Sequence, residues 1–137
     1  MMIIDGTNLI LGRMASKVAK ILLGGEEVTI INAEKIIISG QRKEIFSKYK
    51  ARRDRGDVYK GPFTPRMPDR LVRRTVRGML PRKKAKGIAA LSKLSVYMGV
   101  PDTVKGKPEE IDVSKSSLKD QKYVTVHELC KWLGAKV

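Results

Sequence analysis

Cysteine, histidine and aromatic residues are scarce in this sequence of 137 residues, which has one cysteine, one histidine, one tryptophan and two phenylalanines. The single cysteine, Cys130, excludes an internal disulfide and fits a reducing compartment. So few residues give no support to a zinc site of Cys and His or to a Ser-His-Asp triad. His127 and Cys130 could form a Cys-His pair on one predicted helix, but a lone buried cysteine usually behaves as a small hydrophobic residue.

Long apolar runs and nucleotide-binding motifs are also missing. No apolar run approaches the roughly 20 residues of a membrane span, and the amino-terminal stretch "MMIIDGTNLILGRMAS" lacks the features of a signal peptide. The turn "DGTNLILGR" lacks the G-x-G-x-x-G fingerprint, and no phosphate-loop motif is present. The acidic residues show no pattern for paired acid-base work. We therefore predict a cytoplasmic, non-membrane protein that is not an enzyme, with no catalytic or metal-binding residues, no cofactor and no obligate small-molecule ligand.

Positive charge, by contrast, is abundant and concentrated. The chain has 29 Lys and Arg residues against 14 Asp and Glu, a net charge of +15. Residues 42–86 hold seventeen of the basic residues and only four acidic ones, whereas residues 1–41 are neutral overall. Charge gathered in one third of a chain indicates a binding surface for a polyanion. Nucleic acid fits best, and an anionic membrane surface is the weaker alternative.

The most basic stretch, "RLVRRTVRGMLPRKKAKG" at residues 70–87, predicts a helix over 70–80 with two unlike faces. On one side lie the apolar residues and a threonine: Leu71, Val72, Thr75, Val76, Met79 and Leu80. On the other lie the arginines: Arg70, Arg73, Arg74 and Arg77. Pro68 and Asp69 suit the first turn, and Pro81 ends the element. A solvated helix face usually mixes both signs of charge, so this stripe favours a polyanion ligand over simple exposure to water.

The remaining pattern predicts an α/β fold. Strands are expected at residues 2–5, 28–32, 36–39 and 95–100, and helices at residues 11–22, 42–53 and 88–94. A last helix should begin after Thr125, whose spacing to Glu128 is that of a capping box. The β-branched, nearly all-apolar strands favour a parallel sheet covered on both faces. The polar segment 101–122 is expected at the surface.

A long loop at residues 54–68 carries the rest of the basic segment. Its Gly, Pro and charged residues leave little apolar surface to bury, so we expect the loop to be mobile in the free chain and ordered on RNA. Tyr59 and Phe63 flank Gly61 and Pro62 in this loop. These aromatic rings could stack on unpaired bases or could pin the loop to its own domain, and the sequence does not choose between the two.

The stretch "VRGMLPRKKAKGIAALSKLSVYMG", residues 76–99, resembles the signature of the ribosomal protein L13 family of the large subunit. The resemblance extends over residues 2–101, and "KGPFTPRMPDRLVRRTVRGMLP" is similar to the archaeal and eukaryotic branch. It implies a three-layer α/β/α domain with a four-stranded, mostly parallel sheet. It also implies a structural constituent of the large ribosomal subunit that binds large-subunit rRNA, supports assembly and contacts neighbouring ribosomal proteins in the cytoplasm.

We therefore predict one domain over residues 1–137, with its rRNA-binding segment at 42–86. The predicted rRNA-binding residues are Arg52, Arg53, Arg55, Lys60, Arg66, Arg70, Arg73, Arg74, Arg77, Arg82, Lys83, Lys84 and Lys86, with Tyr59 and Phe63 as candidates for base stacking. Two alternatives stay open at this point. One is a general nucleic-acid-binding protein that coats DNA, and the other is an enzyme that acts on nucleic acid.

Overall fold

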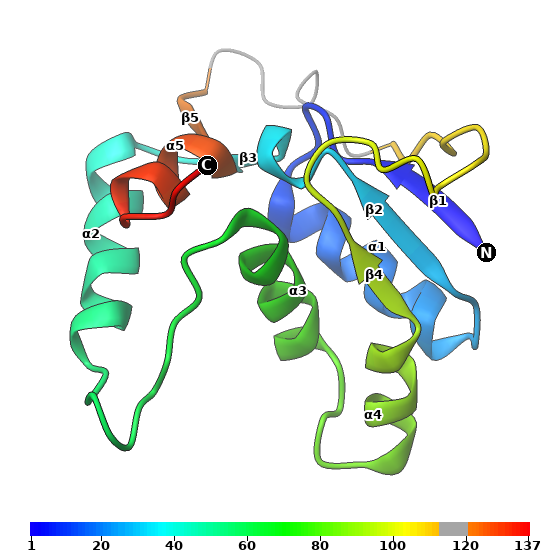
Figure 1. Cartoon of the computed structure of the whole chain (residues 1–137), viewed down its shortest axis with the longest axis horizontal. Helices are drawn as coiled ribbons and strands as arrows, with labels where there is room; N and C mark the ends of the chain where they lie inside the picture. Colours follow the sequence, from blue (N-terminus) through cyan, green and yellow to red (C-terminus); the bar gives the residue numbers. More distant parts are fainter. Residues whose placement is uncertain (113–120) are drawn as a thin grey trace.

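The structure is a computed structural model that describes residues 1–112 and 121–137; residues 113–120, part of the polar segment expected at the surface, lie outside the described residues (Figure 1). The strands are β1 (Met2–Asp5), β2 (Val28–Ile31), β3 (Ile37–Ser39), β4 (Leu94–Val96) and β5 (Tyr123–Thr125). The helices are α1 (Leu11–Leu23), α2 (Arg42–Asp54), α3 (Pro68–Met79), α4 (Ala85–Ser92) and α5 (Val126–Trp132), with a short 3-10 turn, η1 (Ala33–Lys35). The mixed α/β class predicted from the sequence is confirmed.

Strands β1, β2 and β4 form a parallel sheet in the order β1-β2-β4, which gives three strands where four were predicted. The candidate strand at residues 36–39 does not join this sheet, because β3 pairs antiparallel with β5 instead. Strand β2 ends one residue earlier than predicted. Asn32 has a φ of 53°, a left-handed conformation that cannot continue a strand. Its side chain donates a hydrogen bond of 2.9 Å to Asp5 Oδ1 and so ties the carboxyl ends of β1 and β2 together.

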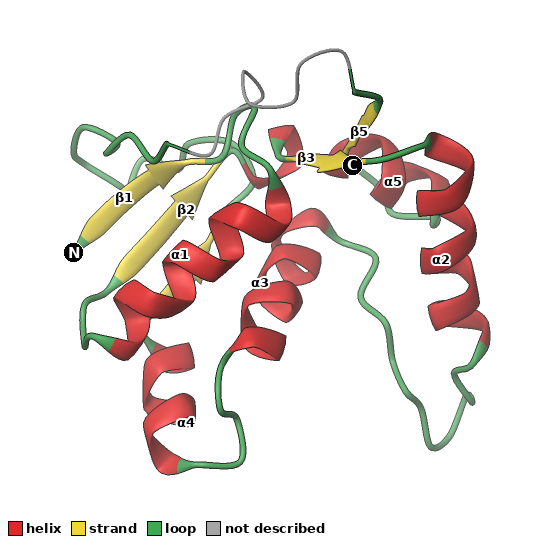
Figure 2. Ribbon diagram, turned by 180° about the vertical axis from the view of Figure 1, so that it is seen from behind, coloured by secondary structure: helices red, strands yellow, loops and turns green. Residues whose placement is uncertain are grey.

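Within residues 1–112 and 121–137, helices cover one face of this sheet, and the three-layer arrangement expected from the resemblance is not found there. From β1 to β2 and from β2 to β4 the chain moves across the sheet in one direction. Because crossovers between parallel strands are right-handed, both connections place their helices, α1 and then α3 and α4, on the same face of the sheet (Figure 2). Ile4, Val28 and Ile30 point to that side and belong to the main hydrophobic core. Ile3 and Ile31 point to the opposite side and are buried outside that core. Helices on both faces would require the chain to change its direction across the sheet at one point, as it does in doubly wound sheets.

The helical spacing in the sequence identified most of the core. The buried residues of α1 are those predicted: Leu11, Met14, Ala15, Val18, Ala19 and Leu22. In α3 the predicted apolar face is also buried at Leu71, Val72 and Val76, but Met79 is 43% exposed, contrary to the prediction, because the helix ends there. Helix α4 begins three residues earlier than expected. Leu94, predicted as its last residue, opens β4 instead.

Strands β3 and β5 carry a second group of elements, α2 and α5, beside the parallel sheet (Figure 1). The Thr125 side chain accepts a hydrogen bond of 3.2 Å from the Glu128 N–H, which confirms the predicted capping interaction at the start of α5. Phe46 of α2 stacks on Trp132 of α5 with ring centroids 4.8 Å apart. Aromatic stacking therefore joins two helices that are far apart in sequence.

The buried Cys130 gives a test of this packing. Burial, reinforced by the nearby Asp69 carboxylate, raises the pKa of the Cys130 thiol from 9.0 to about 12. At pH 8 only about one thiol in 10⁴ is then ionised in the folded protein, against roughly one in ten in the unfolded chain. We expect iodoacetamide to leave Cys130 unmodified in the native protein at pH 8 and to alkylate it quickly in guanidinium chloride, as followed by mass spectrometry. Rapid alkylation without denaturant would contradict the packing of α5.

Candidate nucleic-acid interface

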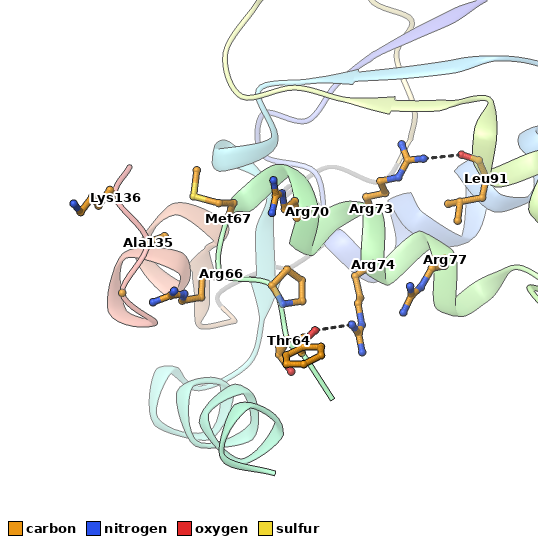
Figure 3. A pocket seen from close by; sticks show the side chains of 13 residues that line it. Thr64, Arg66, Met67, Arg70, Arg73, Arg74, Arg77, Leu91, Ala135 and Lys136 are labelled. Carbon is orange, nitrogen blue, oxygen red and sulfur yellow. Dashed lines mark hydrogen bonds between the residues drawn. The ribbon is translucent and has the colours of Figure 1, made fainter. Parts of the chain in front are cut away.

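Helix α3 holds the arginine stripe in place through its opposite face. Leu71, Val72 and Val76 are buried against the core, and each contributes about 1.5–3 kcal/mol through the apolar surface it removes from water. Pro68 starts the helix, where its missing N–H costs nothing, and Asp69 lies in the first turn. In Figure 3, Arg74 and Arg77 project from one side of this helix, whereas Arg73 points to Leu91 on the other. Their backbone positions are thus fixed by a buried apolar face.

Arg73 departs from the predicted row of four free arginines. Its guanidinium donates hydrogen bonds to the carbonyl oxygens of Leu94 and Leu91, the latter at 3.2 Å (Figure 3). The carbonyls in the last turn of a helix have no intrahelical partner, and a cation there also complements the helix dipole. Arg73 therefore links α3 to the junction of α4 and β4, a role within the fold that the charge pattern did not show.

A groove of about 780 Å³ lies beside α3 and contains much of the stripe. Five of the predicted binding residues line it: Arg66, Arg70, Arg73, Arg74 and Arg77. Its other wall includes the segment Phe63 to Met67 and, from the carboxyl end of the chain, Gly134, Ala135 and Lys136 (Figure 3). Neither charge nor hydrophobic pattern along the sequence predicts a role for this end of the chain in binding. No local signal could have revealed it, because the tail reaches the groove only through the fold of α5 against α2.

Arg53 secures that carboxyl end. Its guanidinium donates to the carbonyl oxygen of Leu133, directly after α5. A cation at the carboxyl end of a helix satisfies an unpaired carbonyl and interacts favourably with the helix dipole. Like Arg73, Arg53 was predicted as an rRNA ligand and also has a contact within the protein.

The electrostatics of the stripe favour an anion. Desolvation lowers the pKa of Arg77, and the nearby cations Arg74 and Arg82 lower this pKa further. Within residues 1–112 and 121–137, the ion pair found joins Arg42 to Glu128 at 3.6 Å, away from this groove. The arginines of the groove therefore have no carboxylate partner in the described part of the chain. An anion bound between them would relieve their mutual repulsion.

The other predicted basic residues lie on two exposed segments. Arg52 places its guanidinium 5.3 Å from the Tyr49 ring centre, while Arg55 and Lys60 are exposed in the loop that follows α2. The second segment joins α3 to α4 and is exposed at Arg82, Lys83, Lys84 and Lys86. None of these residues lines the groove beside α3. The predicted rRNA-binding residues are therefore spread over several parts of the surface.

The loop after α2 has an anchored half and an exposed half. Arg74 donates a hydrogen bond of 2.9 Å to the carbonyl oxygen of Phe63, and Thr64 Oγ1 donates one of 3.4 Å to the carbonyl of Arg52. These contacts hold the segment that enters α3. Tyr59 is 89% exposed and Phe63 is 64% exposed, so neither ring is buried against the domain. Exposure leaves both rings free to stack on bases, which stays a prediction.

The described residues contain no constellation typical of catalysis. No group of three or more His, Cys, Asp or Glu residues within them could hold a metal ion, and none of their helices is long and apolar enough to cross a membrane. The raised pKa of Cys130 is the opposite of what an activated thiolate requires, so a Cys-His pair is not supported. A groove lined by arginines, with no catalytic constellation among the described residues, fits the class of proteins that bind the phosphates of nucleic acids.

Comparison with known proteins narrows this class to one family. The profile described as Ribosomal protein L13 matches residues 1–103. Three relatives, each called Large ribosomal subunit protein uL13, are similar over almost the whole chain. The relative from Methanosphaera stadtmanae is 50% identical, across 98% of this chain and 97% of its own length. The relative from Methanococcoides burtonii is 45% identical across 99% of both chains, and that from Archaeoglobus fulgidus is 46% identical across 96% of this chain and 86% of its own. This chain belongs to the ribosomal protein L13 family.

The two kinds of arginine on α3 can be separated by stability. Replacing Arg73→Gln removes a charged donor from two backbone carbonyls, and we expect the free energy of unfolding to fall by about 1.5–3 kcal/mol. Arg70→Gln, on the same helix but exposed and without such contacts among the described residues, should change it by less than about 0.5 kcal/mol. Urea unfolding followed by Trp132 fluorescence measures both values. Equal free energies of unfolding for the two variants would contradict a structural role for Arg73.

The loop can be tested by amide exchange. The amides of Arg55, Gly56 and Asp57 donate to backbone carbonyls, whereas Val58, Tyr59 and Lys60 form the exposed tip of the loop. The amides of this tip should therefore exchange rapidly in the free protein and slowly when RNA is bound. The strands Val28–Ile31 and Leu94–Val96 should be protected in both states. Hydrogen exchange followed by mass spectrometry measures the protection of the loop and of the strands in the free and the RNA-bound protein. Strong protection of the loop without RNA would mean that the domain itself orders it.

Proposed function

We propose that this chain is a structural constituent of the large ribosomal subunit, in which it binds large-subunit rRNA and supports subunit assembly. Members of its family are structural proteins and not enzymes, which agrees with the absence of a catalytic constellation among the described residues. The chain acts as one domain over residues 1–137, on the cytoplasmic ribosome, with neighbouring large-subunit proteins as its other partners. The observation that carries the proposal is the cationic groove beside α3.

The chemistry of that groove suits RNA phosphates. Arg70 and Arg77 project from a helix whose backbone is held by its buried face, so only their side chains have to become ordered when RNA binds. A guanidinium group can place two parallel hydrogen bonds on one phosphate, which a lysine ammonium cannot do in the same fixed geometry. The basic residues at 82–86 extend the surface beyond the helix, and Arg55 and Lys60 extend it along the loop. We assign the phosphate contacts to these exposed residues.

A protein that coats DNA is the alternative with the same charge. A groove with fixed walls favours a folded RNA over a uniform duplex, because its arginines can meet phosphates only where the backbone has a matching shape. Competition between protein-free large-subunit rRNA and duplex DNA for the same labelled complex separates the two functions. Preference for rRNA at equal phosphate concentration supports the proposal, and equal competition favours the DNA-coating alternative.

The affinity for rRNA should depend steeply on salt. The excess of positive charge in residues 42–86 can neutralise on the order of 6–10 phosphates, so the affinity should fall roughly 10³- to 10⁵-fold between 50 and 200 mM salt. The double substitution Arg70→Gln and Arg77→Gln should reduce the slope of log affinity against log salt by about two and leave thermal stability unchanged. Filter binding and thermal melts measure these quantities. A flat salt response of the native protein would argue for a different partner.

A further inference from the structure

We propose that a second groove, between α2 and α3, holds a stretch of rRNA sugar-phosphate backbone directly against the helices, and that Gly12 and Gly78 make room for it. This inference rests on the proposed function and names a binding site within it. Gly12 lies outside the basic segment 42–86, so this site includes a part of the chain to which charge alone assigns no role.

The second groove has a volume of about 570 Å³ and is built from three helices. From α2 come Lys48 and Arg52, with Arg55 directly after the helix; from α3 come Arg74 and Gly78. Gly12, in the first turn of α1, also lines the groove. Figure 2 shows α2 and α3 on either side, with the loop that joins them below. One wall is α2, which Ile45 and Phe46 hold on the core, and the other is α3, which is held by its own buried face.

Only positive charges line this groove. Lys48, Arg52, Arg55 and Arg74 contribute four cations, and no acidic side chain is among the lining residues. Arg74 uses one guanidinium nitrogen to hold the Phe63 carbonyl, while Arg52 lies over the Tyr49 ring. These contacts orient both groups but do not neutralise them. An occupant must therefore be anionic along its length.

The glycines show how close the occupant comes. Glycine inside a helix is less favourable than alanine, so a fold keeps one where a side chain would collide. That reason holds for Gly87, where an added Cβ would lie 2.2 Å from the Pro81 carbonyl oxygen. It does not hold for Gly12 or Gly78, because an added Cβ would meet no atom within 4 Å at either position. Neither has a positive φ. The folded chain gives no steric reason for either glycine, and both open onto the same groove.

The first turn of α1 adds suitable donors next to Gly12. Ile10 precedes this helix and provides no side-chain cap, so the N–H groups of Leu11 and Gly12 donate no capping hydrogen bond to it. N–H groups at a helix start attract phosphate through hydrogen bonds and the helix dipole. In a groove with four cations, a phosphodiester chain matches both the charge and the donors. An acidic peptide is the competing occupant, and the test below separates the two.

The test adds bulk at the two open positions and measures binding and stability separately. The variants are Gly78→Ala, Gly78→Leu and Gly12→Ala, with Ala89→Leu as a matched control at an exposed position of α4 outside the groove. We expect melting temperatures equal to or above that of the native protein for both alanine variants, since the added methyl meets no atom. Affinity for protein-free large-subunit rRNA should fall about threefold to tenfold for each alanine variant and more than about tenfold for Gly78→Leu. Ala89→Leu should bind as the native protein does.

Each other outcome has a defined meaning. If the glycine variants bind rRNA normally while Arg70→Gln with Arg77→Gln weakens binding, the inference is wrong and the proposed function stands. If neither set weakens binding, the proposed function falls as well. If the glycine variants bind free rRNA normally but fail to enter large subunits reconstituted with the other ribosomal proteins, the occupant is a protein and the inference is overturned. Should Gly78→Leu unfold, the alanine variants alone decide the matter.

Discussion

The packing of α3 against α1 and the parallel sheet is the interaction on which the rest of this structure depends. It buries Leu71, Val72 and Val76 in the same core as Val18 of α1 and Ile30 of β2. An isolated helix of twelve residues with several arginines and no paired acids would be marginal in water. Burial of its apolar face supplies the stability that the charged face lacks. The repulsion between the arginines is thus tolerated because another part of the same helix is strongly held.

The same geometry divides the arginines by function. A stripe on a helix surface has two edges, and the edge nearer the sheet meets backbone carbonyls. Arg73 lies at that edge and satisfies carbonyls of Leu91 and Leu94, whereas Arg70 remains exposed. Arg53 does the same for Leu133 at the end of α5. Guanidinium groups thus serve both as internal donors and as the outer charged surface, and only their surroundings distinguish the two uses.

The carboxyl end of the chain completes the surface. Strand β5 pairs with β3, the capping threonine starts α5, and the Phe46–Trp132 stack fixes α5 on α2. These contacts bring Gly134 and Lys136 to the groove beside α3. They also fix the position of α2 relative to the core, which gives the second groove its far wall. The two-stranded sheet is small, yet it pairs the two strands that lead into α2 and α5.

The sequence by itself determined what depends on neighbours along the chain. Helical spacing identified the buried face of α1 and most of that of α3, and the charge pattern located the basic segment. Sequence patterns did not decide how strands pair, because an apolar run such as residues 36–39 can join either a parallel or an antiparallel partner. They also did not separate Arg73 from Arg70, since both share one stripe and differ only in the distant carbonyls that they meet. Those choices depend on contacts between residues far apart in the chain, so only the tertiary structure decided them.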